Sequence, residues 1–125
     1  MLLSIITPTY NEALNIEKFI RGIEKAIKIK NYEIIFVDDN SIDKTYEVIK
    51  RIAKKKQNIR CLRRVGRRGL SSAVIEGCLS SSSDLLLIMD ADLQHDEKKI
   101  PIMLKKLISE NLDLVIASRF LDSKK

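Results

Sequence analysis

Short apolar runs alternate regularly with amphipathic segments along the whole chain, and this alternation restricts the fold more than any other feature. The apolar runs predict strands at residues 2–7, 32–38, 59–63, 84–89 and 112–117. Four segments between them carry apolar residues at helical spacing. Strands that alternate with helices are typical of successive βαβ units. The sequence therefore predicts an α/β protein with a mostly parallel sheet and helices on both of its faces.

The composition agrees with this class and with a single domain over residues 1–125. Hydrophobic residues make up 45% of the chain, whereas aromatic residues make up 5% and Trp is absent. An aliphatic core rich in Ile, Leu and Val suits a parallel sheet that is buried on both faces. No repeat or flexible linker divides the sequence.

The charge of the chain indicates an anionic partner. The formal net charge is +6, and nine basic residues lie between positions 51 and 68. A nucleotide diphosphate, a lipid phosphate and an anionic membrane surface all fit this charge, and a solvated helix face is the alternative explanation. Nucleic acid is disfavoured because no aromatic residue for base stacking lies among these cations.

The cysteine spacing and the hydropathy pattern bear on the cellular environment. Cys61 and Cys78 have no CxxC or Cys/His spacing, so we expect buried, reduced thiols in a cytoplasmic protein. The first residues do not form a signal peptide. No apolar stretch approaches the roughly 20 residues of a membrane-spanning helix. Any membrane contact is therefore expected to be peripheral.

Polar residues follow four of the five predicted strands, where an open α/β sheet binds its ligands. The candidate residues at these positions are Pro8, Tyr10 and Glu12 after the first strand, Asp38 and Asp39 at the end of the second, Asp90, Asp92 and Gln94 after the fourth, and Arg119 after the fifth. Because the carboxyl ends of parallel strands meet at one edge of the sheet, we expect three acidic clusters and a guanidinium along one rim.

The pair Asp90 and Asp92 suits a hard divalent cation, because two carboxylates and a nearby amide oxygen are preferred ligands of such an ion. The alternative is that these residues only end a strand and cap the next helix. Asp38 and Asp39 point to opposite sides of their strand, so only one of them can face a given ligand. Tyr10 is either a stacking platform for a base or an ordinary loop tyrosine.

Five ordered motifs together resemble glycosyltransferase family 2, and within it the dolichol-phosphate mannosyltransferase group. They are PTYNE at 8–12, VDDNSIDKT at 37–45, RRGLSSAVIEG at 67–77, MDADLQH at 89–95 and ASRF at 117–120. The resemblance covers essentially the whole chain and implies a GT-A fold. It further implies a Mg or Mn ion and a nucleotide-sugar donor, GDP-mannose in preference to UDP-glucose, with a dolichyl or polyprenyl phosphate as acceptor.

The family also implies a role for each matching residue. Pro8, Tyr10, Glu12 and Asp39 would hold the nucleotide, with Asp38 and Asp90 beside them; Asp90, Asp92 and Gln94 would ligate the metal; Asp92 and Arg119 would be catalytic, with Arg119 on a phosphate. The implied reaction inverts the anomeric carbon. An acceptor phosphate is already anionic near neutral pH, so it needs no strong general base.

The family continues well beyond the ASRF motif, so we expect this chain to be the donor half, without the acceptor half. One alternative is therefore a non-catalytic nucleotide-sugar-binding fragment or one subunit of a split enzyme. Dimerisation or a partner chain would then cover the exposed sheet edge. A receiver-like signalling domain is a distant alternative, because its acidic pair and lysine would belong after other strands than those observed.

Overall fold

Four parallel strands form one sheet in the computed structural model, which describes residues 2–120. The strands are β1 (Leu3–Thr9), β2 (Tyr32–Asp38), β3 (Ile59–Arg63) and β4 (Leu85–Ile88), and their spatial order is β3-β2-β1-β4. At the centre of the sheet, Ile6 of β1 lies opposite Ile35 of β2 and Ile88 of β4. The strands therefore all end at the same edge of the sheet.

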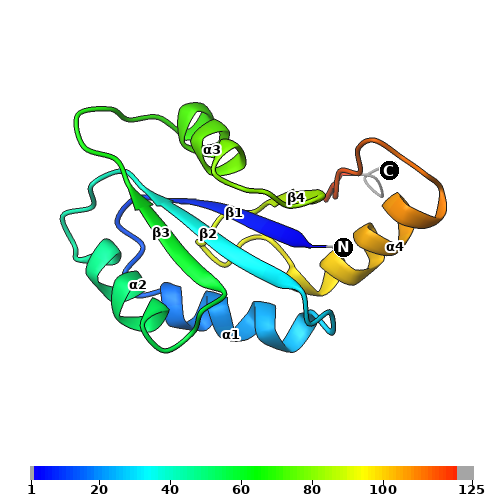
Figure 1. Cartoon of the computed structure of the whole chain (residues 1–125), viewed down its shortest axis with the longest axis horizontal. Coiled ribbons are helices and arrows are strands. Elements are labelled where there is room, and N and C mark those ends of the chain that lie inside the picture. Colours follow the sequence, from blue (N-terminus) through cyan, green and yellow to red (C-terminus); the bar gives the residue numbers. More distant parts are fainter. Residues whose placement is uncertain (1, 121–125) are drawn as a thin grey trace.

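Helices cover both faces of this sheet (Figure 1), which confirms the predicted α/β class. They are α1 (Ile16–Ala26), α2 (Thr45–Ala53), α3 (Leu70–Leu79) and α4 (Ile100–Ser109), the last preceded by a short 3-10 helix, η1 (Glu97–Lys99). The core residues of α1, α2 and α4 form one cluster with the sheet, and α3 packs on the opposite face.

The larger core forms because α1 turns one apolar stripe toward the sheet. Ile16, Phe19, Ile20 and Ile23 are buried at helical spacing, as the sequence predicts. The ring of Phe19 meets that of Phe36 on β2 edge to face, with their centroids 5.9 Å apart. This packing fixes the start of α1, and with it the loop that leaves β1.

On the opposite face, a glycine lets α3 approach the sheet closely. A Cβ atom added to Gly77 would lie 2.4 Å from Cγ2 of Ile6 and 3.0 Å from Cγ2 of Val37. Ala73, one turn earlier, is buried against the same strands. Small residues on the inner side of α3 therefore bring the loop before this helix close to the ends of the strands.

The prediction of a strand at residues 112–117 is wrong. The residues after α4 are irregular, and Leu114 and Ile116 are more than 70% exposed. Alternating apolar side chains favour a strand only where another strand offers hydrogen bonds. Within residues 2–120, no strand pairs with this segment.

The structure also bears on the expectations for the cysteines and for membrane-spanning helices. Cys61 and Cys78 are both free thiols, as expected, but they are partly rather than fully buried. Burial raises the pKa of Cys61 to about 12. Within residues 2–120, no helix is both long and apolar enough to cross a membrane.

Candidate functional site

Two loops at the carboxyl ends of β1 and β2 are tied together by side-chain hydrogen bonds. Three successive backbone N–H groups of the first loop donate to oxygens of the second: Asn11 N to Ser41 Oγ (2.9 Å), Glu12 N to Thr45 Oγ1 (3.0 Å) and Ala13 N to Asp43 Oδ2 (3.1 Å). Asn11 returns a bond by accepting from Ile42 N. The motifs PTYNE and DDNSID therefore form one fixed wall.

Asp38 lies beneath this wall and is completely buried. Its carboxylate accepts hydrogen bonds from Thr9 Oγ1 (2.9 Å), Ser41 N (3.0 Å) and Ser41 Oγ (2.6 Å). These bonds connect the ends of β1 and β2 to the loop that follows. In this structure, the side chain of Asp38 positions the loop and does not face solvent, although the sequence grouped it with the nucleotide-binding residues.

Asp39 turns to the other side and meets Arg64, which directly follows β3. Arg64 Nε donates to Asp39 Oδ1 (2.6 Å), and Arg64 Nη2 donates to Oδ2 (2.9 Å). The Gly69 N–H adds a third bond to Oδ2 (3.0 Å). The Arg64 side chain is 1% exposed and that of Asp39 is 12% exposed. This two-point pair links the end of β2 to the loop before α3.

The pair keeps Asp39 ionised. Burial alone would raise the pKa of this carboxyl, but the hydrogen bonds from Arg64 and Gly69, together with the charge of Arg64, outweigh burial and lower it. Arg64 is in turn held by Ser72 Oγ (2.8 Å) and by the carbonyl of Gly69 (2.9 Å). An anionic oxygen is thus fixed at the rim with a small exposed area.

Tyr10 and Glu12 belong to the same wall, and Arg68 connects Tyr10 with the surroundings of Asp39. The ring of Tyr10 is 44% exposed, and the guanidinium of Arg68 lies 4.6 Å from its centroid. The Glu12 carboxylate accepts a hydrogen bond from Asn15 Nδ2. Pro8 is half-buried in β1, opposite Val37 of β2. A stacking ring, a cation and the Asp39 carboxylate therefore share one region of the rim, and Glu12 follows two residues after the ring in the same loop.

The DADLQH segment follows β4, the other neighbour of β1, and its own side chains hold it in shape. Asp90 N donates to His95 Nδ1 (3.1 Å), and Gln94 N donates to Asp92 Oδ1 (3.1 Å). Leu93, between them, has a positive φ of 66°. Asp92 and Gln94 are exposed and Asp90 is half-buried. The sequence is thus right that these polar groups lie just beyond a strand.

The donors of this segment fit a divalent cation chemically, although they do not form a complete cage. Within the described part of the chain, no cluster of three His, Cys, Asp or Glu side chains could hold a metal ion. Two carboxylates and an amide oxygen nevertheless suit Mg²⁺ or Mn²⁺, because such ions usually take their remaining ligands from water and substrate phosphates. Asp90, Asp92 and Gln94 are the residues that would hold it.

Arg119 is not brought to the rim by a strand, because the predicted fifth strand is absent from residues 2–120. Its side chain is exposed. The basic residues at 51–68 also differ from a simple solvated helix face, since several form ion pairs. These pairs are Arg51–Glu17, Lys56–Glu24, Arg60–Glu33, Arg64–Asp39, Arg64–Glu76 and Arg67–Glu76.

Sequence reasoning missed the role of Arg64, which it counted only as one of these cations. The available signal was its position, because it directly follows β3, and β3 is the neighbour of β2, which ends at Asp38. A cation and a carboxylate after adjacent parallel strands are within reach of each other. Recognising this required the strand order, which the motifs alone do not supply.

A family profile and curated relatives identify the protein family of this chain. The profile described as "Glycosyl transferase family 2" matches residues 4–125. The chain belongs to glycosyltransferase family 2. The dolichol-phosphate mannosyltransferase of Pyrococcus furiosus is 42% identical over 96% of this chain, and that of Saccharomyces cerevisiae is 39% identical over 83%. The chain spans 34% and 40% of the lengths of these two relatives.

Solved structures agree with the family and give the fold its name. A mannosyltransferase from Pyrobaculum calidifontis, in complex with GDP-mannose and Mn²⁺, superimposes with a TM-score of 0.74 at 27% identity, over 84% of this chain and 32% of its own. Glucosyl-3-phosphoglycerate synthase from Mycobacterium tuberculosis gives a TM-score of 0.68 at 22% identity, over 86% of this chain and 40% of its own. The sheet is that of the GT-A glycosyltransferases, which confirms the expected fold and removes the receiver-like alternative.

Proposed function

We propose that this chain is the donor-binding part of a metal-dependent, inverting glycosyltransferase that moves mannose from GDP-mannose to a dolichyl or polyprenyl phosphate. The observation that carries the proposal is the convergence of three polar loops at the ends of the neighbouring strands β2, β1 and β4. The identity to dolichol-phosphate mannosyltransferases and the likeness to a structure with GDP-mannose and Mn²⁺ support this choice of donor and acceptor.

The wall formed by the first two loops would hold the nucleoside. Tyr10 offers a ring on which a base can stack, in the region that Arg68 now covers. Asp39 offers an ionised carboxylate that can accept a hydrogen bond from a base or a ribose, since part of it remains exposed. Glu12 would accept a second such bond, and Pro8 would shape the floor. Asp38 would act indirectly, through the loop that it fixes.

The DADLQH segment would serve the diphosphate. Asp90, Asp92 and Gln94 would hold Mg²⁺ or Mn²⁺, which supplies neutralisation of the charge that develops on the leaving diphosphate. The nucleophile is a phosphate oxygen of the acceptor, which is already anionic, so the chain needs no general base at this position. Alignment of donor and acceptor would supply the rest of the rate.

The position of Arg119 supports a second candidate function, which is donor binding without sugar transfer. We propose that it contacts a phosphate, but in residues 2–120 no strand holds it at the rim. A chain with this arrangement binds the donor without transferring the sugar, until a partner chain or a second copy completes the acceptor side. Either form would work at the cytoplasmic face of a membrane, where it would meet a lipid phosphate.

Isothermal titration of GDP-mannose, GDP and UDP-glucose, with and without Mn²⁺, tests the donor site. The variants are Asp92→Ala and, as a control, Asp113→Ala, which removes another exposed carboxylate, from the irregular segment after α4. We expect metal-dependent binding of GDP-mannose by the wild type and the control, and loss of that binding in Asp92→Ala.

The outcomes separate the two candidates. Metal-dependent binding followed by transfer of mannose to a polyprenyl phosphate supports the full reaction. Binding without transfer supports the donor-binding unit. Folded protein that binds none of the nucleotides, with or without metal, overturns both.

A further inference from the structure

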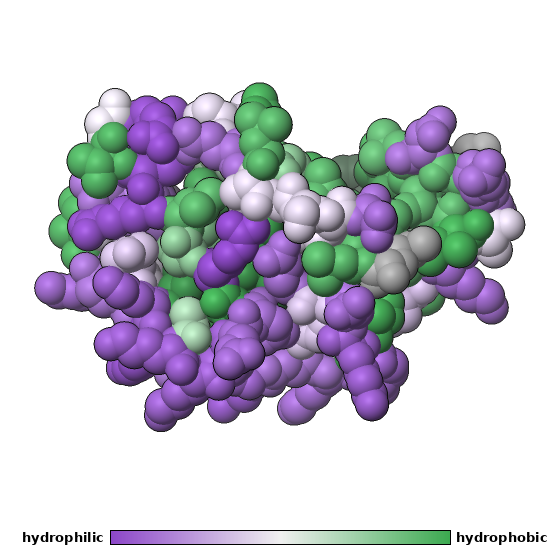
Figure 2. Space-filling model, viewed as in Figure 1, coloured by the Kyte–Doolittle hydropathy of each residue, from purple (hydrophilic) through white to green (hydrophobic). Residues whose placement is uncertain are grey.

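Two of the helices on one face of the sheet, α1 and α2, carry most of the excess positive charge of the protein. Residues 16–30 and 44–56, which contain α1, α2 and the turns after them, hold eleven basic and three acidic residues, a net charge of +8. The whole chain carries +6, so the other residues together are slightly acidic. We call these two segments the basic layer. Figure 2 shows hydrophilic side chains gathered along the side where α1 and α2 lie.

The cations of this layer point to solvent because the apolar stripes of the helices are used by the core. On α1, Ile16, Ile20 and Ile23 face the sheet, whereas Lys18, Arg21 and Lys25 are exposed on the outer side at helical spacing. On α2 and its flanks, the exposed cations are Lys44, Lys50, Arg51, Lys54 and Lys55. The basic layer is therefore an outward surface and not an interior feature.

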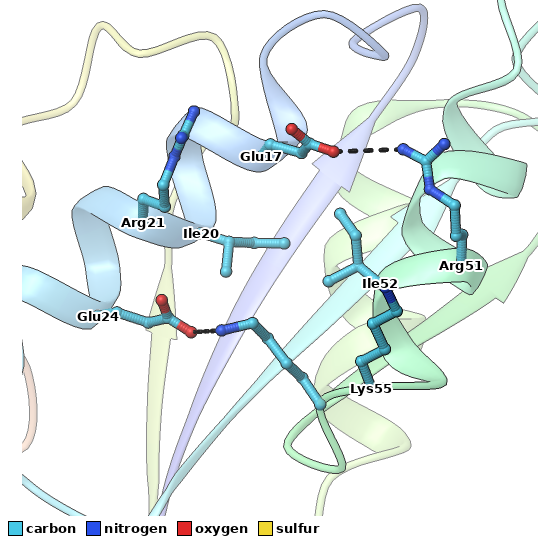
Figure 3. A pocket seen from close by; sticks show the side chains of 8 residues that line it. Glu17, Ile20, Arg21, Glu24, Arg51, Ile52 and Lys55 are labelled. Atoms are coloured by element: carbon cyan, nitrogen blue, oxygen red, sulfur yellow. Dashed lines mark hydrogen bonds and ion pairs between the residues drawn. The ribbon is translucent and has the colours of Figure 1, made fainter.

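The acidic residues within the layer are mostly neutralised by their neighbours. A groove of about 440 Å³ runs between α1 and α2, with Ile20 and Ile52 among its lining residues. Ion pairs join its two sides, Glu17 with Arg51 at 3.2 Å and Glu24 with Lys56 (Figure 3). Arg21 and Lys55 also line the groove and form no ion pair with any described residue. Two uncompensated cations thus flank an opening on the basic layer.

We infer that the basic layer is a docking surface for an anionic membrane, through the phosphate headgroups of its lipids. Clustered lysines and arginines are attracted to an anionic bilayer surface, and this attraction acts over about a Debye length, roughly 8 Å at physiological salt. Helices that lie flat on the sheet present many cations to one plane at once. The inference stands on this charge and does not depend on the transfer reaction proposed above.

Nucleic acid is the competing polyanion, and the layer lacks what it needs. Single-stranded nucleic acid is held by cations together with exposed aromatic rings. The two aromatic residues of the layer are Phe19 and Tyr46. Phe19 is buried, and Tyr46 is half-buried with Arg63 and Lys50 near its ring. A bilayer needs no stacking platform.

The basic layer lies beside the candidate site, so docking on a membrane would bring this site near lipid phosphates. Both helices begin at the rim, α1 after the PTYNE loop and α2 after the DDNSID loop. A membrane against the outer side of α1 and α2 would therefore lie next to the carboxyl ends of β1 and β2. The surface would hold the site near lipid phosphates without inserting any helix into the bilayer.

Vesicle co-sedimentation tests the inference on the full chain. Vesicles of equimolar phosphatidylcholine and phosphatidylglycerol are compared with vesicles of phosphatidylcholine alone. The test variant is Arg21→Glu with Lys55→Glu, and the matched control is Lys98→Glu with Lys105→Glu, which changes net charge equally at exposed positions outside the layer. Thermal melting and titration with GDP accompany both variants, so that folding and the nucleotide site are measured separately.

We expect the wild type and the control to bind the anionic vesicles but not the vesicles of phosphatidylcholine alone. Addition of 1 M NaCl should release both proteins, because the Debye length then shortens to about 3 Å. The test variant should bind about tenfold more weakly than the control or worse. Equal losses in the two variants, or no binding by the wild type, overturn the inference. Tighter binding to a single-stranded oligonucleotide than to the vesicles overturns it in favour of nucleic acid. If neither the wild type nor the variants bind GDP, this result counts against the proposed function but does not affect the conclusion from the vesicles.

Discussion

Removing Arg64 should destabilise the protein far more than removing any neighbouring surface cation. In Arg64→Ala, the nearly buried Asp39 carboxylate loses two charged hydrogen bonds and keeps only that of the Gly69 N–H. The Gly69 carbonyl and Ser72 Oγ each lose a donor as well. Leaving one partner of a buried ion pair uncompensated costs about 3–5 kcal/mol. Arg67→Ala breaks a more exposed pair with Glu76 and should cost about 1 kcal/mol or less.

The pH dependence of this loss tests the reasoning further. In the wild type, the folded pKa of Asp39 lies below the ordinary 3.8, so its pair contributes stability above that value, which is lost as pH falls through the folded pKa. In Arg64→Ala, burial without a partner should raise the folded pKa above 3.8, so the variant gains relative stability as the carboxyl protonates. The deficit should therefore shrink between about pH 7 and pH 4.

Urea unfolding followed by circular dichroism at several pH values measures both effects. The double variant Asp39→Ala, Arg64→Met removes the two charges together and should recover part of the lost free energy of unfolding, because no buried charge is then left alone. A loss in Arg64→Ala no larger than that in Arg67→Ala, or a deficit that does not change with pH, would refute the role assigned to the pair.

Two other features give sharp expectations. Gly77→Ala should lower the free energy of unfolding by about 1–3 kcal/mol, because the new Cβ would lie 2.4 Å from Cγ2 of Ile6. The control Gly22→Ala meets only the flexible end of Glu97, so its free energy of unfolding should stay within about 1 kcal/mol of wild type. Urea unfolding compares the two variants, and equal costs would contradict this packing. The Cys61 thiol, with its pKa raised to about 12 by burial, should hold roughly a thousandth of its population as thiolate at pH 9.0. In a Cys78→Ser background, its alkylation in the native protein should be at least about a hundredfold slower than in urea, and similar rates in the two states would show that the thiol is not shielded.

The strands and helices were predictable wherever the apolar period was unambiguous and the core supplied the partner. Strands β2 and β3 coincide with the predicted ranges, and β1 and β4 differ only at their ends. The stripe of Ile16, Phe19, Ile20 and Ile23 predicted the buried side of α1. The segment at 112–117 was not predictable in this way, because its alternation describes the side chains of a strand but not the neighbour with which it must pair.

The start of α2 shows the same limit at a single residue. Ser41 and Asp43 both have the side chains of a helix cap, yet the residue before the helix is Lys44, with a positive φ of 72°. Ser41 Oγ instead accepts a hydrogen bond from Asn11 N in the loop after β1. Asp43 serves both partners, because its Oδ1 accepts from Thr45 N at the start of the helix and its Oδ2 accepts from Ala13 N. Which of two competing partners a polar side chain takes depends on what the fold brings near it.

The sequence by itself determined the fold class, the family and the order of the polar motifs along the chain, because these depend on periodicity and on residues close together in the chain. The tertiary structure decided how the two adjacent carboxylates divide their work: Asp38 is buried as a brace for the loops, whereas Asp39 is held at the rim by Arg64. That division depends on the order of the strands. Only the folded sheet places the end of β3 beside the end of β2, so that a cation 25 residues away can pair with one aspartate and not with the other.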